Sequence, residues 1–326
     1  MTNQEFYKEV EQNIMAYMPP EFTRNEEVNV TEIVKNNALK LHGLTIKKEN
    51  EEMSPNVYLE NFYNDFQEGR PMNEIMQNIA DMYMAAYSSV DRNTIAKPDI
   101  SLKYEDVKDK LTVQILDMKR NKEKLKTMAF TPIGNDLAMT YAYIVSSDEL
   151  GEAKIGITRA IAQEYGYNLT ELSKDALENS VKTHPAILSD MNNVMEAMMG
   201  GSPTEPPLLN DGLKVDKDAQ MLVLSNVHGL QGAATLFYPG VQEQVAHAID
   251  DNYFVLPSSI HEVLIVPERA GHSAKELENM VKDVNTTVAP DEVLSDKVLR
   301  YDRDSKELSF ANRDAREKGS QEREER

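Results

Sequence analysis

The stretch of residues 137–145, LAMTYAYIV, carries the pattern that most constrains the fold of this chain. Large side chains such as Leu137, Tyr141 and Tyr143 alternate there with small ones such as Ala138. A period of two residues is typical of a β-strand that rests one face on a core. The chain must therefore build at least one sheet, and the KIGIT segment at residues 154–158 is the predicted partner of this strand.

Further strand-like stretches alternate with helix-like ones. We expect a hairpin over residues 28–46 with a bulge at His42 and Gly43, and further strands at 221–227, 233–238, 253–257 and 261–267. Helical spacing predicts helices at 6–17, 71–86, 107–118, 159–165, 171–183 and 240–249, and the capping box of Ser273 with Glu276 begins another. The predicted class is α+β, with antiparallel strand units packed by helices in two or three subdomains.

The clearest boundary is the segment MGGSPTEPPLLNDG at residues 199–212. Its glycines and prolines cannot continue a helix or occupy a central strand, so we expect a linker or an exposed loop. On this division an N-terminal α+β unit covers 1–95, a middle α+β unit covers 100–198, and a ββαββα-like unit at 213–310 ends in a hairpin that turns at 303–306. The polar tail, residues 311–326, is predicted to be disordered.

Charge and cysteine content exclude several classes of function. The chain has 55 acidic and 35 basic residues, a formal charge of −20, which repels the phosphates of nucleic acids and of anionic membranes. It has no cysteine, so disulfides, thiolate catalysis and Cys-based metal sites are excluded. No signal peptide and no run of apolar residues long enough to span a membrane is found, so we expect a cytoplasmic protein.

Residues 257–267, PSSIHEVLIVP, hold the most suggestive group of reactive side chains. Ser258, Ser259, His261 and Glu262 place hydroxyls, a base and a carboxylate within five residues, which are the groups that a hydrolase needs. In an extended segment, however, His261 and Glu262 point to opposite faces, and the chain contains no G-x-S-x-G elbow. The alternative interpretation is a turn that closes one strand and starts the next.

Neither the histidines nor the methionines point to a cofactor. No two of the six histidines are three or four residues apart, so helical zinc motifs are absent, and we expect no metal and no cofactor. Four methionines lie close together where the 199–212 segment begins: Met191, Met195, Met198 and Met199. A methionine stripe is more often part of a core, but an adaptable surface for a partner is the alternative.

Five stretches together resemble a known family: NNALKLHGLTI, VYLENFYNDFQEG, DLAMTYAYIV, ITRAIAQEYGYNLTELSKDALENS and LPSSIHEVLIVP. In this order they are similar to the domain-of-unknown-function 5688 family of uncharacterised bacterial proteins, over residues 1–310. The fourth stretch also resembles a segment of another uncharacterised bacterial family, number 1444. The resemblance implies a cytoplasmic protein and supplies no catalytic residues to transfer.

These observations lead to one interpretation and one alternative. Because enzyme motifs are missing, we expect a non-catalytic interaction or regulatory protein whose partner is another protein or a peptide, rather than nucleic acid or membrane. The alternative is a hydrolase-like enzyme that uses Ser258 or Ser259 with His261. The sequence leaves the oligomeric state open.

Overall fold

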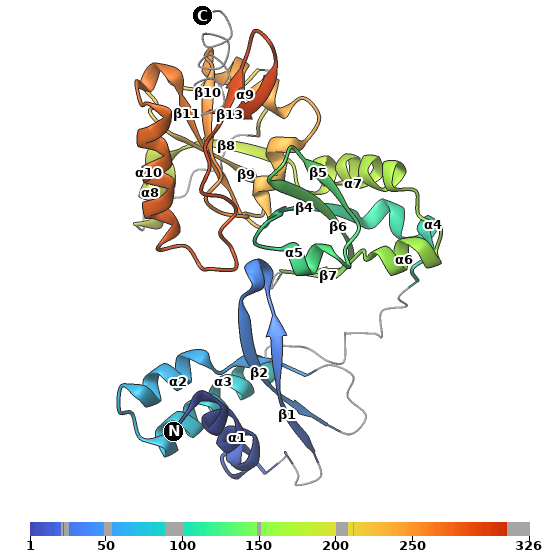
Figure 1. Cartoon of the computed structure of the whole chain (residues 1–326), viewed down its shortest axis with the longest axis vertical. Helices are drawn as coiled ribbons and strands as arrows, with labels where there is room; N and C mark the ends of the chain where they lie inside the picture. The colour runs from blue at the N-terminus through green and yellow to red at the C-terminus, as the bar shows by residue number, and fades with distance from the viewer. Residues whose placement is uncertain are drawn as a thin grey trace, which may run out of the picture. The chain divides into compact units, whose positions relative to one another are not determined.

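The chain folds into two compact units, residues Met1–Pro98 and Asp99–Arg326. The structure is a computed structural model and describes residues 1–20, 22, 26–48, 54–88, 101–148, 151–199, 208–210 and 212–311. Each unit packs helices against antiparallel sheets, which confirms the predicted α+β class (Figure 1). The two units are described separately below.

In the described part of unit 1 the helices α1, α2 and α3 pack against a three-stranded sheet of order β1-β2-β3. Its core holds Phe6 of α1, Ile46 of β2 and Ile79 of α3, and the Tyr83 hydroxyl donates to the Ile46 carbonyl at 2.8 Å. The predicted first helix and the helix after Pro71 are confirmed. The elements are α1 Asn3–Asn13, η1 Ile14–Ala16, β1 Glu27–Val34, η2 Asn36–Ala38, β2 Lys40–Lys47, β3 Val57–Tyr58, α2 Glu60–Gln67 and α3 Met72–Ser88.

The bulge predicted at His42 and Gly43 is wrong. The register between β1 and β2 runs without a break from Glu27 opposite Lys47 to Val34 opposite Lys40. The apolar pattern changes phase because Leu44 faces the core, whereas Leu41 lies on the other face of the strand near the hairpin turn. The apolar alternation along β2 therefore changes because a different face of the strand is buried in its second half. No extra residue is inserted in the pairing with β1.

Unit 2 contains two sheets. In the first, β6 pairs with β4, β5 and β7, and in the second the order is β13-β12-β10-β11-β9-β8, with every pair antiparallel. The elements from Tyr104 to Thr183 are α4 Tyr104–Val107, η3 Lys108–Lys110, β4 Leu111–Asp117, α5 Lys122–Leu125, β5 Phe130–Ile133, β6 Leu137–Asp148, β7 Gly151–Gly156, α6 Arg159–Glu164 and α7 Leu169–Thr183. Those that follow are β8 Ala186–Asp190, α8 Met191–Met198, β9 Leu222–Asn226, η4 Gly232–Phe237, α9 Val241–Ile249, β10 Tyr253–Leu256, β11 Val263–Pro267, η5 Glu268–Ala270, α10 Ala274–Asn285, β12 Leu299–Asp302 and β13 Glu307–Phe310.

Alternate residues of β10 pack on different helices. Val255 packs in the cluster that contains Val245 of α9, whereas Phe254 packs in the cluster that contains Leu277 of α10. The two helices lie on different sides of the six-stranded sheet (Figure 1). The capping box of Ser273 with Glu276 begins α10 as predicted. The sheet is therefore covered on both faces, and its central strands β10 and β11 read as continuous apolar runs.

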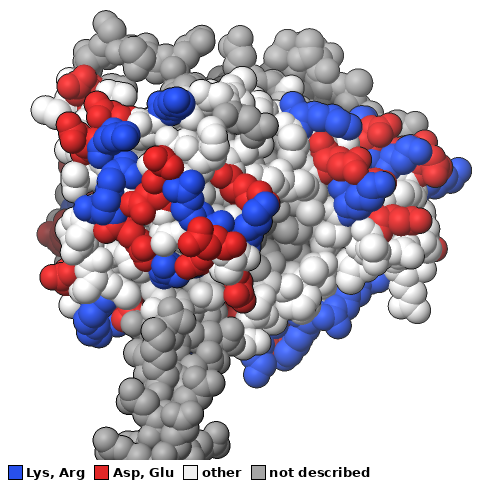
Figure 2. Space-filling model, turned by 90° about the horizontal axis from the view of Figure 1, so that it is seen from above, with Lys and Arg blue, Asp and Glu red and all other residues white. Residues whose placement is uncertain are grey.

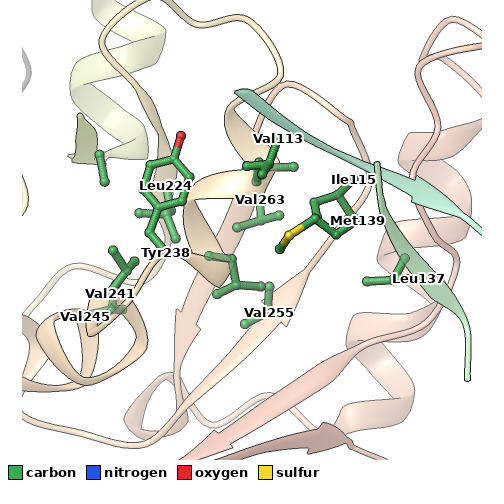
Figure 3. Close-up of a cluster of buried hydrophobic side chains, with 14 of the residues drawn as sticks. Val113, Ile115, Leu137, Met139, Leu224, Tyr238, Val241, Val245, Val255 and Val263 are labelled. Carbon is green, nitrogen blue, oxygen red and sulfur yellow. The ribbon is translucent and has the colours of Figure 1, made fainter. Parts of the chain in front are cut away.

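The predicted middle and C-terminal units share one core. Val113 of β4 and Met139 of β6 lie in the same buried cluster as Leu224 of β9 and Val263 of β11 (Figure 3). Strand β8, which precedes the 199–212 segment, is the edge of the second sheet. The structure thus joins 100–198 and 213–310 in one compact unit. Most of the segment predicted as a linker, and the tail beyond Ala311, lie outside the described residues.

Two predicted elements of unit 2 are wrong in type. Residues 111–117 form strand β4 instead of a long helix, because a spacing of four residues between Leu111 and Ile115 suits a strand as well as a helix, and Thr112 on the other face is also buried. Residues 232–237 form the short helix η4 instead of a strand. Ala233, Thr235 and their neighbours are buried on all sides, so the segment shows no periodicity.

Candidate functional site

The Ser258–Glu262 segment is an ordered connection between β10 and β11. The carbonyl of Ser258 accepts a hydrogen bond from Leu294 N, and Ser259 forms an isolated bridge with Val293. Both serines are buried, with exposed fractions of 5% and 4%. The segment is thus tied to residues 293–294 by its backbone, as the turn interpretation expects.

The serine hydroxyls and the imidazole do not form a nucleophile–base pair here. Ser259 Oγ accepts the backbone N–H of His261 at 2.9 Å, and the structure describes no hydrogen bond between either serine Oγ and the His261 ring. The ring Nδ1 of His261 accepts the backbone N–H of Gln231 at 3.3 Å, and Nε2 lies 3.5 Å from a carboxylate oxygen of Glu292. Since Nδ1 is the acceptor, the proton of the neutral ring is on Nε2. The His261 ring thus connects the loop that contains Gln231 with the loop that contains Glu292.

A pocket of about 920 Å³ lies beside edge strand β8. Its walls come from β8 and β9, from the first turn of α8, from residues 213–216 and from the turn after β9, and Glu262 also reaches it. Of the four residues predicted as a site, Glu262 is the one that lines this pocket. Sequence patterns missed the pocket because neither β8 nor its place at the sheet edge was predicted.

The chain's own Leu208 and Leu209 lie against the outer edge of β8, where Leu208 forms an isolated antiparallel bridge with Ile187. Val227 N donates to Pro185 O and Met191 N donates to Met221 O, both at 3.1 Å, so the odd-numbered residues bond toward β9. The N–H and C=O of Leu188 therefore face the outer edge, because these groups alternate in direction along a strand. At the start of that edge, Leu209 N donates to Ala186 O at 2.9 Å.

Polar side chains with little exposure line the pocket. Ser225 Oγ donates to the His261 carbonyl at 2.8 Å, and Asn226 Nδ2 donates to the Leu230 carbonyl at 2.8 Å. Ser189 is 8% exposed, and its hydroxyl makes no hydrogen bond within the described part of the chain. A nearly buried hydroxyl that lines a pocket without a protein partner is suited to bind a polar group of a ligand.

Exposed methionines lie in helix α8, whose first turn lines this pocket, and just after it. Met195 is 53% and Met199 85% exposed, while Met191 is partly buried and the side chain of Met198 lies outside the described ones. Leu208 and Val227, which flank β8, are 50% and 43% exposed. For the described methionines the surface alternative therefore fits Met195 and Met199, and the pocket has apolar surroundings.

A second polar cluster, which sequence patterns also missed, lies under one end of the pocket. His184, which is 3% exposed, places Nε2 at 3.0 and 3.1 Å from the two carboxylate oxygens of Glu152, and Lys154 Nζ lies 2.7 Å from Glu152. His228 Nε2 lies 3.1 Å from the carbonyl of Thr183, and its ring packs edge-on against that of His184 at 5.0 Å. His228 also lines the pocket.

The charges of this cluster follow from burial and pairing. Burial lowers the pKa of His184, and the neighbouring Glu152 opposes that effect without reversing it. Burial raises the pKa of Glu152, but the hydrogen bond and charge of Lys154, together with His184, outweigh it, so that the pKa of this carboxyl is lowered. Glu152 is therefore ionised and His184 neutral at neutral pH.

Unit 1 has a smaller polar cluster around Glu60. Glu60 Oε1 accepts the backbone N–H of His42 at 2.6 Å and lies 3.1 Å from the His42 ring, which stacks on Tyr7 with centroids 4.2 Å apart. Burial, followed by the charge of Glu60, raises the pKa of Tyr7 to about 12. These contacts join α1, β2 and α2, and a stacked, hydrogen-bonded arrangement of this kind is structural.

No group of three or more His, Asp or Glu side chains among the described residues is placed to hold a metal ion. No described helix has both the length and the apolar character needed to cross a bilayer.

Comparison with known proteins gives one match. The model of a family described as "Family of unknown function (DUF5688)" matches residues 3–303. No curated protein and no solved structure matches the chain. The geometry of the pocket and of the two polar clusters is therefore the basis for any functional conclusion.

Proposed function

The chain belongs to the DUF5688 family of unknown function, and we propose that it is a non-catalytic interaction protein that binds a peptide, or a segment of another protein, in the pocket beside β8. One observation carries the proposal: a pocket of about 920 Å³ between β8, β9 and α8 is lined by Ser189, whose nearly buried hydroxyl makes no hydrogen bond within the described part of the chain. Concave pockets with apolar walls and a few polar groups of this kind are where proteins bind ligands.

The surroundings of the pocket support the same proposal. Met195 in α8 and Met199 just after it offer flexible apolar side chains, which suit a surface that adapts to a bound chain. The polar residues of the pocket that are hydrogen-bonded, such as Ser225 and Asn226, are bonded to backbone groups and not to one another. This arrangement provides recognition rather than a nucleophile with its base.

The proposed partner is a protein or a peptide inside a bacterial cell, and neither nucleic acid nor a membrane. The formal charge of −20 opposes binding to phosphates, and the absence of cysteine fits a chain that needs no oxidising compartment. The family resemblance supports the bacterial, cytoplasmic setting.

The test is selection of short peptides from a displayed random library by the full chain. Asn193→Trp puts a large side chain into the pocket, whereas Glu196→Trp adds the same side chain on the same helix at an exposed position outside the pocket. We expect the selected peptides to bind the wild type and the Glu196→Trp variant but not the Asn193→Trp variant. Selected peptides that bind all three proteins equally would show that the pocket is not the binding site.

The hydrolase alternative has its own test, which is labelling with a serine-reactive fluorophosphonate. Because neither serine hydroxyl is hydrogen-bonded to the His261 ring, we expect no labelling of the wild type. Labelling that disappears in both Ser258→Ala and His261→Ala, while both variants remain folded, would replace the interaction proposal with an enzymatic one.

A further inference from the structure

Thr183, His184 and Glu152 form a chain of hydrogen bonds that ends at the surface. Thr183, the last residue of α7, is exposed, and its Oγ1 lies 2.7 Å from Nδ1 of His184. On the other side of the ring, Nε2 lies 3.0 and 3.1 Å from the two carboxylate oxygens of Glu152. A hydroxyl, an imidazole and a carboxylate in this order are the parts of a nucleophile, its general base and the group that orients the base.

The protonation states are those that such a chain of groups requires. Burial lowers the pKa of His184, and the charge and hydrogen bond of Glu152 oppose this effect without reversing it. The charges of Lys154 and His228, which also face the ring, lower the pKa further. The ionised Glu152 holds the proton of the neutral ring on Nε2, so that the lone pair of Nδ1 faces the Thr183 hydroxyl. His184 can therefore accept the proton of Thr183.

The charge pair behind His184 is more buried than surface pairs of unit 2. The side chains of Glu152 and Lys154 are 14% and 15% exposed, and their charged groups lie 2.7 Å apart. A pair such as Glu268 with Arg300 is more exposed, and acidic and basic side chains stand side by side on the face shown in Figure 2. Because a buried ion pair loses its hydration, it contributes little to stability. Its effect here is to fix the position and the charge of the carboxylate that bonds His184.

The surroundings of Thr183 favour a neutral acyl donor over a phosphoryl donor. The hydroxyl lies at the C-terminal end of α7, where the helix dipole is negative, and the chain has a formal charge of −20. Both features repel the anionic phosphates of a phosphoryl donor. The branched Cβ of threonine also leaves more room for attack on a planar carbonyl carbon than on the tetrahedral phosphorus of a fluorophosphonate.

We propose that Thr183 is a site of covalent acylation, with His184 as its general base and Glu152 as the residue that positions the ring. The hydroxyl oxygen bonds the carbonyl carbon of an activated ester or thioester, and the bond from that carbon to the leaving oxygen or sulfur breaks. The hydroxyl proton passes to Nδ1 of His184 and then to the leaving group. The products are a threonine ester and an alcohol or thiol, with no change of oxidation state. Because each chain is acylated once, this inference goes beyond the proposed function and does not depend on it.

The experiment adds p-nitrophenyl acetate to the full chain at neutral pH and maps the acetyl groups on tryptic peptides by mass spectrometry. We expect an acetyl group on Thr183 as an ester, which hydroxylamine removes, whereas the amides of acetylated lysines resist it. Thr170 is the internal control and should stay unmodified. It is exposed near the start of the same helix and has no hydrogen bond to a histidine within the described part of the chain.

Variants of the base and of the positioning residue separate their roles. His184→Gln should slow the acylation of Thr183 by about 100-fold or more, the usual contribution of a general base. In the wild type the rate should fall only below the ordinary histidine value of about 6.5, because burial lowers the pKa of the ring. Glu152→Gln should slow the reaction and also move this fall to lower pH, since the charge of Glu152 raises that pKa. A merely structural role of Glu152 would leave the pH profile in place.

The acceptor itself is tested at an exposed position, where substitution is compatible with folding. Only Thr183→Ser, and not Thr183→Val, should be acetylated. No ester on Thr183 in the wild type, or an ester that forms as fast in His184→Gln, would overturn the inference. Neither result affects the peptide selection with Asn193→Trp that tests the proposed function. Continued release of nitrophenolate that depends on Thr183 would support acylation and would replace the non-catalytic proposal with an enzymatic one.

Discussion

Thr183 has one hydroxyl proton and two possible acceptors for it. Its Oγ1 lies 2.9 Å from the carbonyl of Asn179 and 2.7 Å from Nδ1 of His184. When His184 is neutral with its proton on Nε2, that N–H bonds Glu152 and the Thr183 hydroxyl donates to Nδ1. When the ring is an imidazolium, Nδ1–H donates to Thr183 and the hydroxyl turns to Asn179. The contact between His184 and Glu152 is kept in both states.

Titration of His184 should make the stability of unit 2 depend on pH. Burial lowers the pKa of His184, so the unfolded chain binds this proton at a higher pH than the folded chain does. The free energy of unfolding therefore falls as the pH drops below the ordinary histidine value of about 6.5, with a slope of at most about 1.4 kcal/mol per pH unit from this group.

Denaturant unfolding of the wild type and His184→Gln across that pH range measures the effect. The variant should lose this part of the pH dependence, while His247→Gln, at an exposed position of α9, should keep it. An unchanged slope in His184→Gln would mean that burial does not control this titration.

At the scale of the elements, Gly232 allows η4 to pack closely against β9, which lines the pocket. A Cβ at this position would lie 2.1 Å from Ser225 Oγ, 2.4 Å from the carbonyl oxygen of His261 and 2.8 Å from Asn226 N. Two of these atoms belong to the backbone and cannot move aside. The close approach lets η4 pack against β9 and holds Ser225 and Asn226 in the pocket lining.

Gly232→Ala should therefore lower the free energy of unfolding by about 1–3 kcal/mol and weaken peptide binding. Ser225→Ala in the same chain should not restore stability, because the contact with the His261 carbonyl remains. Gly212→Ala, whose Cβ would meet Asn210 Oδ1 at 3.4 Å, is the matched control and should melt close to the wild type. Thermal melting followed by circular dichroism measures all three variants. Equal melting temperatures for Gly232→Ala and the wild type would contradict the close approach.

The elements that the sequence predicted correctly are those with a marked local pattern, such as the alternation of large and small side chains in β6. Strand β6 keeps large residues such as Tyr141 on the core, and α10 starts at a capping box, so both are visible as local patterns. Strand β4 and η4 are buried on more than one side, which removes the periodicity on which the prediction depends. The pocket was missed for a related reason, since β8 is short and its role comes from pairing with β9, far along the chain.

For the candidate site, local sequence indicated which residues are polar but not what they face. Ser258 to Glu262 stand together in the sequence, yet the partners of His261 are Gln231 and Glu292. In the same way, His184 meets Glu152 across 32 residues. Contacts of this kind follow from tertiary packing, and a single sequence contains no spacing that reveals them.

At the scale of the whole molecule, the shared core of unit 2 decides how the chain can be divided. The cluster that contains Met139 of β6 also contains Leu224 of β9 (Figure 3). Strand β8 is paired with β9, which lies on the other side of residues 199–212 in the sequence. A fragment that ended before β9 would expose these apolar side chains and leave β8 without its sheet. The two halves of unit 2 should therefore depend on each other for folding.

Cutting the chain tests this dependence directly. A protease site inserted between residues 203 and 204 should allow complete cleavage while both pieces continue to elute together in size-exclusion chromatography and melt in one cooperative transition. The separate fragment 99–198 should lack such a transition, whereas 99–326 should keep it, because only the longer fragment contains the whole buried cluster. If the pieces separate after cleavage and melt independently, unit 2 consists of two domains. The boundary would then lie at 199–212, as its glycines and prolines suggest, and the inference from the shared core would be wrong.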